Sequence, residues 1–280
     1  MADSESGHRA PLLHYDPLPV FRDSTTPAGL YARQKWLDES HTASWRHDFQ
    51  QTVTDLLNAQ SADGSWQGSV LETVRRLFGL HLTVRAANAD IDRALEWLMR
   101  HAPSSGALNH VAHDKTLRHE DLAGLPFVPG HPRLTIECAV LFLFSVFGRF
   151  KEPAVLSRYQ RMSSRIITAG PGMEFRLLDV SNALRALVVH PDYAHGPSTA
   201  VLIEYLEHIQ GSSGLWPEPT NIYLTFNALA HVNLEAARRQ LLKAAGSVSR
   251  MQNEDGTWGE DDREWNTFLM VHALKNKGWL

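Results

Sequence analysis

The chain has 280 residues, 43% hydrophobic and 21% charged, so it is long enough to bury one sizeable core as a single compact domain. A formal net charge of -4, with no Lys/Arg run, argues against nucleic acid as a partner and favours a small molecule. The single cysteine, Cys138, excludes an internal disulfide framework and a cysteine-rich zinc module. This suits a reducing compartment, so we expect a cytoplasmic protein.

Residues 1–27 are polar and contain several prolines, without the apolar core of a signal peptide or membrane anchor. We expect an extended N-terminal arm there and a single domain over residues 28–280. The most apolar stretch, residues 134–147, is shorter than the ~20 residues that cross a bilayer, and it contains Glu137. It is predicted to be a buried core helix, and the chain is predicted to have no transmembrane segment.

Two kinds of helical pattern alternate after the arm. Helices that are apolar on most faces are predicted at 30–37, 72–82, 137–147, 179–189, 223–232 and 268–274. Helices with a single apolar side alternate with them, as in 41–59, 91–98 and 202–209. Because all-round apolar helices are buried and one-sided helices face solvent, the pattern predicts six inner and five outer helices in a double ring.

A seven-residue segment recurs at the junctions between outer and inner helices. The segment is Gln-x-x-x-Gly-x-Trp, and its copies start at Gln60, Gln210 and Gln252, the last two 42 residues apart. Degenerate copies at 102 and 168 complete a register in which one interval is 66 residues instead of 42. The chain therefore contains an insertion of about 24 residues, which we place at 109–132.

This segment resembles the QW repeat of the superfamily of prenyltransferases, squalene-hopene cyclases and oxidosqualene cyclases. The resemblance spans roughly residues 45–276 and implies an all-α, six-fold α/α toroid. In that superfamily the Gln caps helix ends and the Trp stacks on its neighbour, so the motif indicates fold more strongly than chemistry. The resemblance also implies a small, largely apolar, isoprenoid-like substrate in a central cavity.

The motifs that carry the chemistry of this superfamily are incomplete here. Class II cyclases protonate an alkene with Asp-x-Asp-Asp, which does not occur; the nearest strings are Asp90-Ile-Asp92 and Asp261-Asp262. Protein prenyltransferases hold zinc with an Asp-x-Cys pair and a later His, but only Asp179 matches in type, since Cys138 lies in another repeat. We therefore expect a reaction different from protonation-initiated cyclisation, and peptide prenylation is disfavoured.

Polar residues at the starts of the inner helices are the catalytic candidates, because helices that ring a cavity direct their first turns toward its mouth. A buried acid there has a raised pKa and can act as general acid or base, whereas the alternative role is helix capping. Both roles stay open for Asp179 and Glu137. The full predicted set is Asp179, Glu137, Glu72, Tyr223 and Asn266. Phe142, Phe144, Phe147, Phe226 and Phe268 either line an apolar pocket or belong to the core.

The insertion concentrates histidines, so it either acts as a lid or binds a divalent metal, the one cofactor that the sequence suggests. A turn could bring the metal candidates His110, His113, His119 and His131 together. Three functions stay open: an enzyme acting on an isoprenoid-like substrate, a metal-dependent enzyme using these histidines, and a non-catalytic toroid that binds a lipid or a protein. No sixth outer helix follows the last inner one, so either the N-terminal arm or a second subunit in a homodimer would cover that gap.

Overall fold

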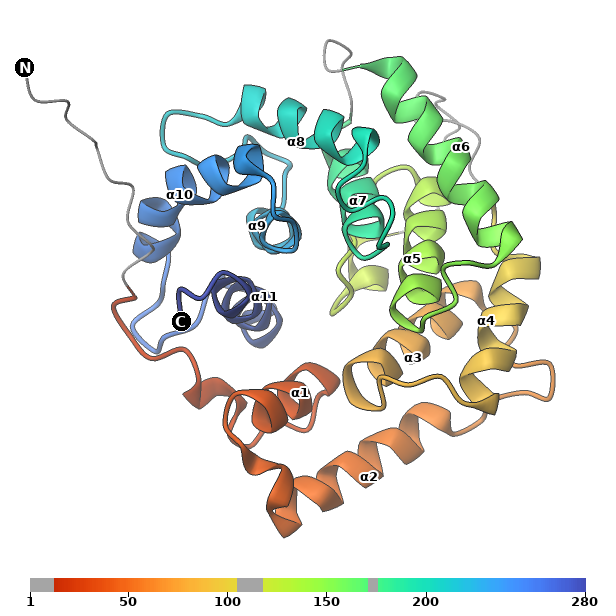
Figure 1. Cartoon of the computed structure of the whole chain (residues 1–280). Helices are drawn as coiled ribbons and strands as arrows, with labels where there is room; N and C mark the ends of the chain where they lie inside the picture. The colour runs from red at the N-terminus through yellow and green to blue at the C-terminus, as the bar shows by residue number, and fades with distance from the viewer. Residues whose placement is uncertain (1–12, 105–117, 171–175) are drawn as a thin grey trace, which may run out of the picture.

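The computed structural model describes residues 13–104, 118–170 and 176–280, which form two concentric rings of helices (Figure 1). The inner ring is made of α1 (Pro27–Lys35), α3 (Val70–Thr83), α5 (Pro132–Val146), α7 (Leu177–Val188), α9 (Ile222–Ala230) and α11 (Arg263–Asn276). The outer ring is made of α2 (Ala43–Leu57), α4 (Ala89–His101), α6 (Pro153–Ala169), α8 (Pro197–Ile209) and α10 (Glu235–Arg250). Each inner helix contacts the next one, and α1 contacts α11, so the inner ring closes. The predicted all-α toroid is confirmed.

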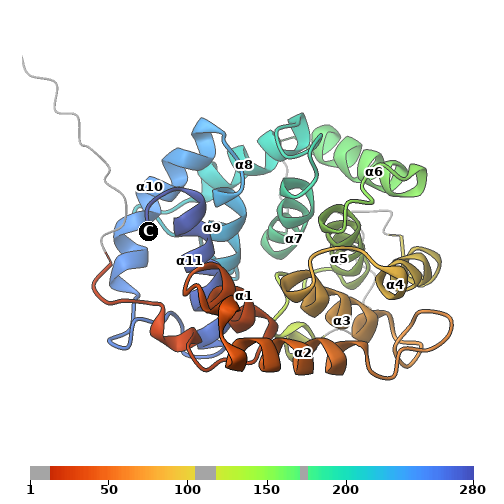
Figure 2. The same ribbon diagram turned by 60° about the horizontal axis from the view of Figure 1, so that its bottom comes forward.

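The two rings differ in burial as the sequence pattern predicts. Helix α5 is buried on most faces, including consecutive residues from Glu137 to Ser145. Helix α4 buries a single side through Ile91, Ala94, Leu95 and Leu98 and leaves its other side in solvent. The tilted view in Figure 2 shows the even-numbered helices outside the odd-numbered ones around the ring.

Some helix ends differ from the sequence expectation because capping residues set them. Helix α5 begins at Pro132, five residues before the predicted start, since proline suits the first turn of a helix. Helix α1 begins at Pro27, where the Thr26 side chain accepts a hydrogen bond from the Gly29 amide. Three short 3-10 helices, η1 (Pro19–Phe21), η2 (Glu39–His41) and η3 (His119–Leu122), lie in the described connections.

The three Gln-x-x-x-Gly-x-Trp segments adopt the same loop. In each, the Gln side-chain amide donates to the carbonyl of the Gly four residues later, at 3.0, 2.7 and 3.0 Å for Gln60, Gln210 and Gln252. Each Gly has a positive φ, between 83° and 96°, which glycine adopts without strain. A Cβ at Gly64 or Gly214 would also lie 2.4 or 2.0 Å from a carbonyl oxygen of the following outer helix. Glycine is therefore required by both the backbone angle and the helix approach.

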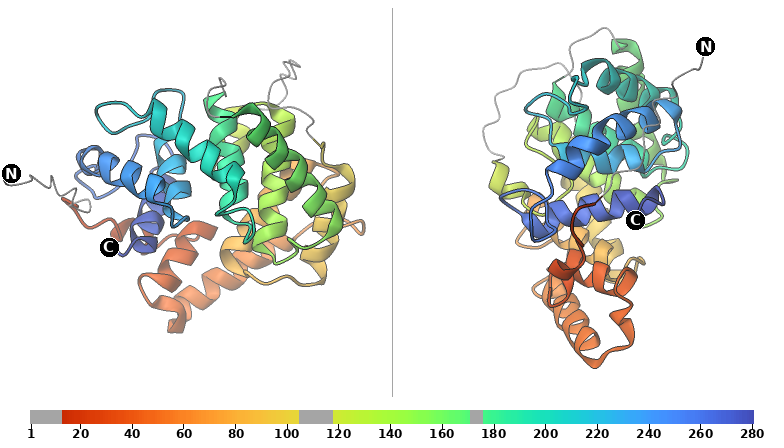
Figure 3. Two further views of the ribbon diagram at one scale, coloured as in Figure 1. Left: turned by 45° about the horizontal axis from the view of Figure 1, so that its top comes forward. Right: turned by 90° about the vertical axis from the view of Figure 1, so that its left-hand side faces the viewer.

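The third Gln-x-x-x-Gly-x-Trp loop contacts the N-terminal segment where the other two contact an outer helix. The side-chain amides of Gln60 and Gln210 also donate to backbone carbonyls of α4 and α10, each at 2.9 Å. The amide of Gln252 donates to the Tyr15 carbonyl instead, at 2.8 Å, and its oxygen accepts from the amides of His14 and Tyr15. Figure 3 shows the N-terminal segment, in red, beside the C-terminal helices, in blue. At this third loop, His14 and Tyr15 thus take the contacts that an outer helix supplies at the other two.

Candidate functional site

The inner ring encloses a cavity of about 340 Å³, which we call the central cavity. Its volume falls in the range of ~300–1,000 Å³ that is typical of small-molecule sites. Pairs of residues four apart line it from one face of a helix. His81 lies on α3 and Arg85 just beyond its end, and Asn227 lies on α9 with His231 just beyond its end. These pairs lie at the C-terminal ends of their helices, so the polar side of the cavity lies there.

Arg185 is the most deeply buried charged residue of this cavity, with 5% of its surface exposed. Its Nη1 donates a hydrogen bond to Oδ1 of Asn227, and its guanidinium lies 5.5 Å from the centre of the Phe142 ring. Its Nε has no hydrogen-bond partner among the described residues. Burial lowers the pKa of Arg185 to about 10, so the side chain stays positively charged at neutral pH.

Arg85, which lies just beyond the end of α3, supplies a second positive charge to the central cavity. Its guanidinium lies 4.3 Å from the centre of the Tyr31 ring, and its Nη2 donates to the Gln34 side chain at 2.6 Å. Burial lowers the pKa of Arg85. Its Nε is buried and, within the described part of the chain, makes no hydrogen bond. Both arginines are thus held by aromatic faces and amides instead of carboxylates.

Three half-buried histidines, His81, His231 and His272, complete the polar lining. Burial and the positive charge of Arg185 lower all three pKa values, to about 3 for His81 and about 4 for His272, so the rings are neutral at pH 7. The Asn227 amide nitrogen donates to the Leu269 carbonyl at 2.8 Å and lies 3.4 Å from Nδ1 of His272. Because that amide nitrogen can only donate, Nδ1 of His272 is an acceptor and its proton lies on Nε2.

The central cavity therefore carries net positive charge. Among residues 13–104, 118–170 and 176–280, no Asp or Glu lines it, and none forms an ion pair with Arg85 or Arg185. An alkene bound there would meet no carboxylic acid able to protonate it. This agrees with the absence of Asp-x-Asp-Asp from the sequence.

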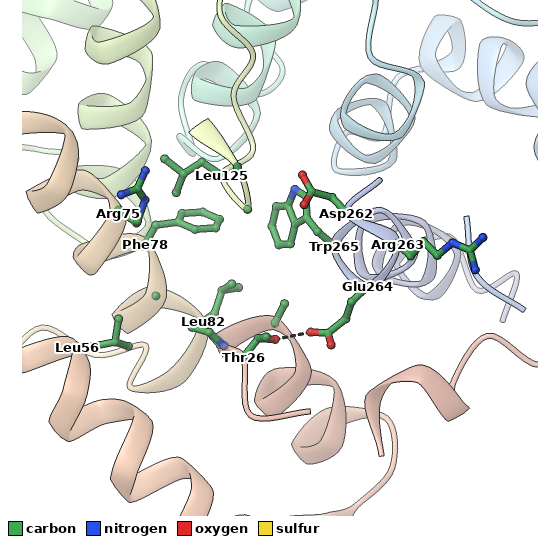
Figure 4. Close-up of a pocket in the computed structure, with 15 residues that line it drawn as sticks. Thr26, Leu56, Arg75, Phe78, Leu82, Leu125, Asp262, Arg263, Glu264 and Trp265 are labelled. Carbon is green, nitrogen blue, oxygen red and sulfur yellow. Dashed lines mark hydrogen bonds between the residues drawn. The ribbon is translucent and has the colours of Figure 1, made fainter. Parts of the chain in front are cut away.

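A second cavity, of about 510 Å³, adjoins the first and is mostly apolar. Leu56, Leu125, Phe78, Leu82 and Trp265 form its walls, and the last three also line the central cavity (Figure 4). The rings of Phe78 and Trp265 meet edge to face, with centres 5.8 Å apart. We call this space the apolar cavity.

The rim of the apolar cavity is charged and lies at the seam between α1 and α11. Glu264, in the first turn of α11, accepts hydrogen bonds from the hydroxyls of Ser24, at 2.9 Å, and Thr26 (Figure 4). Asp262 and Arg263 also lie at this rim, and Arg75 on α3 is the other charged residue that lines the cavity. Glu264 thus ties the first inner helix to the last at the mouth of the cavity.

The described part of the insertion covers the N-terminal mouth of the ring on the side of α5 and α7. Leu122, Leu125, Phe127 and Val128 are at most 5% exposed. The amide and carbonyl of Val128 pair with the side chain of Asn182 on α7, at 2.9 and 2.8 Å. Residues 122–131 therefore form a plug that packs into the ring, and the Phe127 ring contacts Phe142 edge to face.

The five sequence-predicted catalytic residues do not come together at the central cavity. Asp179 is 1% exposed and holds the plug, because its Oδ1 accepts a hydrogen bond from the His131 amide at 2.8 Å. The other carboxylate oxygen, Oδ2, has no partner among described residues, and burial raises the pKa of Asp179. Glu137 is also buried, with a carboxylate oxygen 3.4 Å from the Ser104 hydroxyl. Both lie away from the lining of the two cavities.

The other three candidates have structural contacts. Glu72 forms ion pairs with Arg75 and Arg76, at 3.0 and 2.7 Å. Tyr223 is half-buried against a small apolar cluster next to the plug. The Asn266 amide donates to the Asp261 carbonyl at 2.9 Å. A catalytic role for any of the five stays a prediction.

The predicted metal site lies largely outside the described residues. His110 and His113 fall in the segment 105–117, and nothing is described of the His119 side chain. His131 is 8% exposed at the start of α5, and its Nδ1 has no partner among described residues. Within the described ranges no three His, Cys, Asp or Glu residues are placed to hold a metal ion. The histidine-based metal site therefore stays a prediction.

Sequence reasoning missed the charged group of the central cavity although a signal for it was present. The Ala-Leu pairs at Ala186, Ala228 and Ala273 align α7, α9 and α11, and the residue before each pair is Arg185, Asn227 or His272. Polar residues at one aligned position of otherwise apolar helices indicate a shared inward face. Of the aromatic candidates, Phe142 and Phe268 line the central cavity, whereas Phe144 and Phe226 are fully buried in the core.

No protein-family model matches the chain, and no curated protein matches it. Among solved structures, a protein from Actinoplanes is similar at 17% identity, with a TM-score of 0.57 over 96% of this chain and 92% of that one. Two variants of the type II terpene cyclase MstE from Scytonema, both in complex with geranylgeranyl dihydroxybenzoate, are similar at 13% identity, with TM-scores of 0.57 and 0.55 over 91% of this chain and 87% of theirs. In the described part of this chain, no helix has the length and apolarity needed to span a membrane. At these identities the likeness establishes the fold, and the chain has a terpene cyclase-like α/α toroid.

Proposed function

We propose that the chain is a terpene cyclase-like or prenyltransferase-like enzyme that encloses a small, largely apolar, isoprenoid-like substrate. The apolar cavity and the central cavity share Phe78, Leu82 and Trp265, so one elongated ligand can occupy both. The similar fold of a cyclase that binds a geranylgeranyl compound supports this substrate class. The plug covers part of the N-terminal mouth of the ring, which helps to keep water from the site.

The observation that carries the proposal is the convergence of titratable side chains on a buried cavity. A toroid that only bound a lipid would need an apolar cavity, whereas this one places two arginines and three histidines around its centre. Holding such groups away from water costs free energy, so their gathering at one cavity indicates a functional site. This favours an enzyme over the non-catalytic toroid.

The central cavity also carries aromatic faces and an imidazole base. The rings of Phe142, Trp265 and Phe268 border the central cavity, and aromatic faces stabilise cations. His81 is neutral, and its Nδ1 has no hydrogen-bond partner among the described residues, so it can accept a proton. In this proposal His81 accepts a proton that the bound substrate gives up, and no described residue of the central cavity acts as a carboxylic acid.

A cavity-filling substitution tests the proposal. Leu82 borders both cavities, so Leu82→Trp should block ligand entry, whereas Ile167→Trp, on the exposed side of α6, adds the same ring at a site 46% exposed. We expect farnesyl and geranylgeranyl compounds to bind the wild-type chain and Ile167→Trp but not Leu82→Trp, as measured by isothermal titration calorimetry. Products are then sought by mass spectrometry, with circular dichroism confirming that both variants fold.

Three results would count against this function. If no isoprenoid compound binds the wild-type chain, or if Leu82→Trp binds as well as wild type, the substrate class is wrong. If compounds bind at the cavity without being converted, the chain is a binding toroid and not an enzyme. Near-stoichiometric metal that is lost on substitution of His110 and His113 would move the chemistry to the insertion.

A further inference from the structure

The central cavity holds two guanidinium groups whose charges no carboxylate of the described chain offsets. Elsewhere in the molecule a buried arginine does have such partners: Arg33, 2% exposed, contacts Glu39 at 2.7 Å and Asp48 at 2.8 Å. Arg185 is buried almost as deeply, and within the described ranges it contacts an amide oxygen and an aromatic face but no carboxylate. A buried charge without a counter-charge is costly, so its retention calls for a ligand of opposite charge.

The unused hydrogen-bond donors of both arginines point to the same conclusion. The Nε atoms of Arg85 and Arg185 are buried and have no partner among the described residues. The neutral ring of His272 adds an Nε2–H donor to the cavity lining, since its Nδ1 faces the Asn227 amide. Guanidinium groups bind oxyanions through two parallel N–H donors, and an oxyanion would satisfy these donors and the charge together.

We infer that the central cavity is a subsite for the oxyanion headgroup of the substrate, bound by Arg85 and Arg185, while the apolar cavity holds the hydrocarbon chain. This inference rests on the proposed function and specifies its substrate as an isoprenoid with an anionic end, a carboxylate or a diphosphate. The two cavities meet at Phe78, Leu82 and Trp265, so a single ligand reaches from the apolar walls to the guanidinium groups.

Ligands that differ only at the headgroup test the inference by calorimetry on the full-length chain: farnesyl diphosphate, farnesoic acid and farnesol, with inorganic pyrophosphate alone as a fourth arm. We expect at least one anionic farnesyl ligand to bind roughly 10- to 100-fold more tightly than farnesol, because hydrogen bonds to charged groups contribute this much. The stronger of the two anionic ligands identifies the headgroup. Equal affinity for all three farnesyl ligands would overturn the subsite but would leave the proposed function intact.

Arginine variants locate the effect. Arg185→Met and Arg85→Met should each weaken the anionic ligand by roughly 10-fold or more and leave farnesol unchanged. Arg238→Met, on the exposed face of α10 with 61% of its side chain accessible, removes the same charge from the surface and should change neither. If Arg185→Met does not fold, Arg185→Lys tests the same point, since lysine keeps the charge but cannot bind an oxyanion through two parallel donors.

The remaining outcomes separate the two proposals. Loss of affinity for farnesol as well as for the anionic ligands in both arginine variants would mean that the arginines only shape the cavity, and it would overturn the subsite. Pyrophosphate that binds in an Arg185-dependent way while no farnesyl compound binds would uphold the anion subsite and reject the isoprenoid substrate.

Discussion

Replacing Arg185 by methionine should leave the folded chain about as stable as wild type, although the residue is 5% exposed in the centre of the ring. Burial lowers the pKa of Arg185 from its ordinary value to about 10. At 1.36 kcal/mol for each tenfold change, the fold therefore loses about 3 kcal/mol by holding the charged form. This loss applies at neutral pH and disappears only as the pH rises above about 10. Methionine fills a similar volume and removes the charge.

Two losses oppose this gain. Without the guanidinium, Oδ1 of Asn227 loses its donor, which costs about 1–3 kcal/mol at a buried site. The contact with the Phe142 ring is also lost, at about 1 kcal/mol. The three contributions nearly cancel, so we expect Arg185→Met to lie within about 2 kcal/mol of wild type in urea unfolding.

Arg33→Met is the matched control, because Arg33 is buried and bonded to the carboxylates of Glu39 and Asp48. Breaking a buried ion pair costs about 3–5 kcal/mol, and here somewhat less, since both carboxylate side chains are about a quarter exposed. Arg33→Met should therefore destabilise the chain clearly more than Arg185→Met. If Arg185→Met is as harmful as Arg33→Met, Arg185 is a structural residue and the argument that a ligand offsets its charge fails.

Three further predictions concern ring closure, pH and the plug. Gln252→Ala should lower the free energy of unfolding by about 2–3 kcal/mol and expose the amides of His14 and Tyr15 to hydrogen exchange. Gln60→Ala should lower it by about 1–2 kcal/mol and leave those amides protected. Because the pKa of His272 is lowered to about 4, the folded chain binds fewer protons than the unfolded chain between about pH 4 and 6.5, so stability falls on acidification through that window. His272→Gln should flatten this dependence in urea unfolding at pH 5 and 7; an unchanged slope would contradict the assignment. Asn182→Leu should leave the Val128 amide unpaired and make the plug more sensitive to proteases, and unchanged cleavage would show that apolar packing alone holds it.

The fold was predictable from sequence because the repeated loop and the apolar pattern of each helix are properties of short, contiguous segments. Gln60 and Gly64 belong to one loop, and the same loop recurs at Gln210 and Gln252, so the repeat and its phase are visible without coordinates. Burial on all faces or on one face then separates inner from outer helices. The helix starts at Pro27 and Pro132 were missed because the apolar pattern does not extend to the caps.

The polar centre of the cavity was harder to predict because it depends on which mouth of the ring is open. Sequence reasoning placed the reactive layer at the starts of the inner helices, where Asp179 lies. In the structure the plug covers that mouth at α7, and Asp179 accepts a hydrogen bond from the His131 amide. The insertion was recognised from its length, but its packing depends on long-range contacts such as that between Val128 and Asn182. No pattern within the insertion itself indicates those partners.

The stability of the chain and its proposed ligand are therefore linked. The Ala-Leu pairs that follow Arg185, Asn227 and His272 are fully buried, whereas the residue before each pair faces the central cavity and can carry a polar group. The buried charge of Arg185 lowers the stability of the unliganded chain by about 3 kcal/mol. A ligand present at a hundred times its dissociation constant stabilises the folded chain by about 2.7 kcal/mol. An anionic ligand should accordingly raise the melting temperature of the wild-type chain, and the rise should be smaller in Arg185→Met, since that variant lacks the charge that the ligand neutralises.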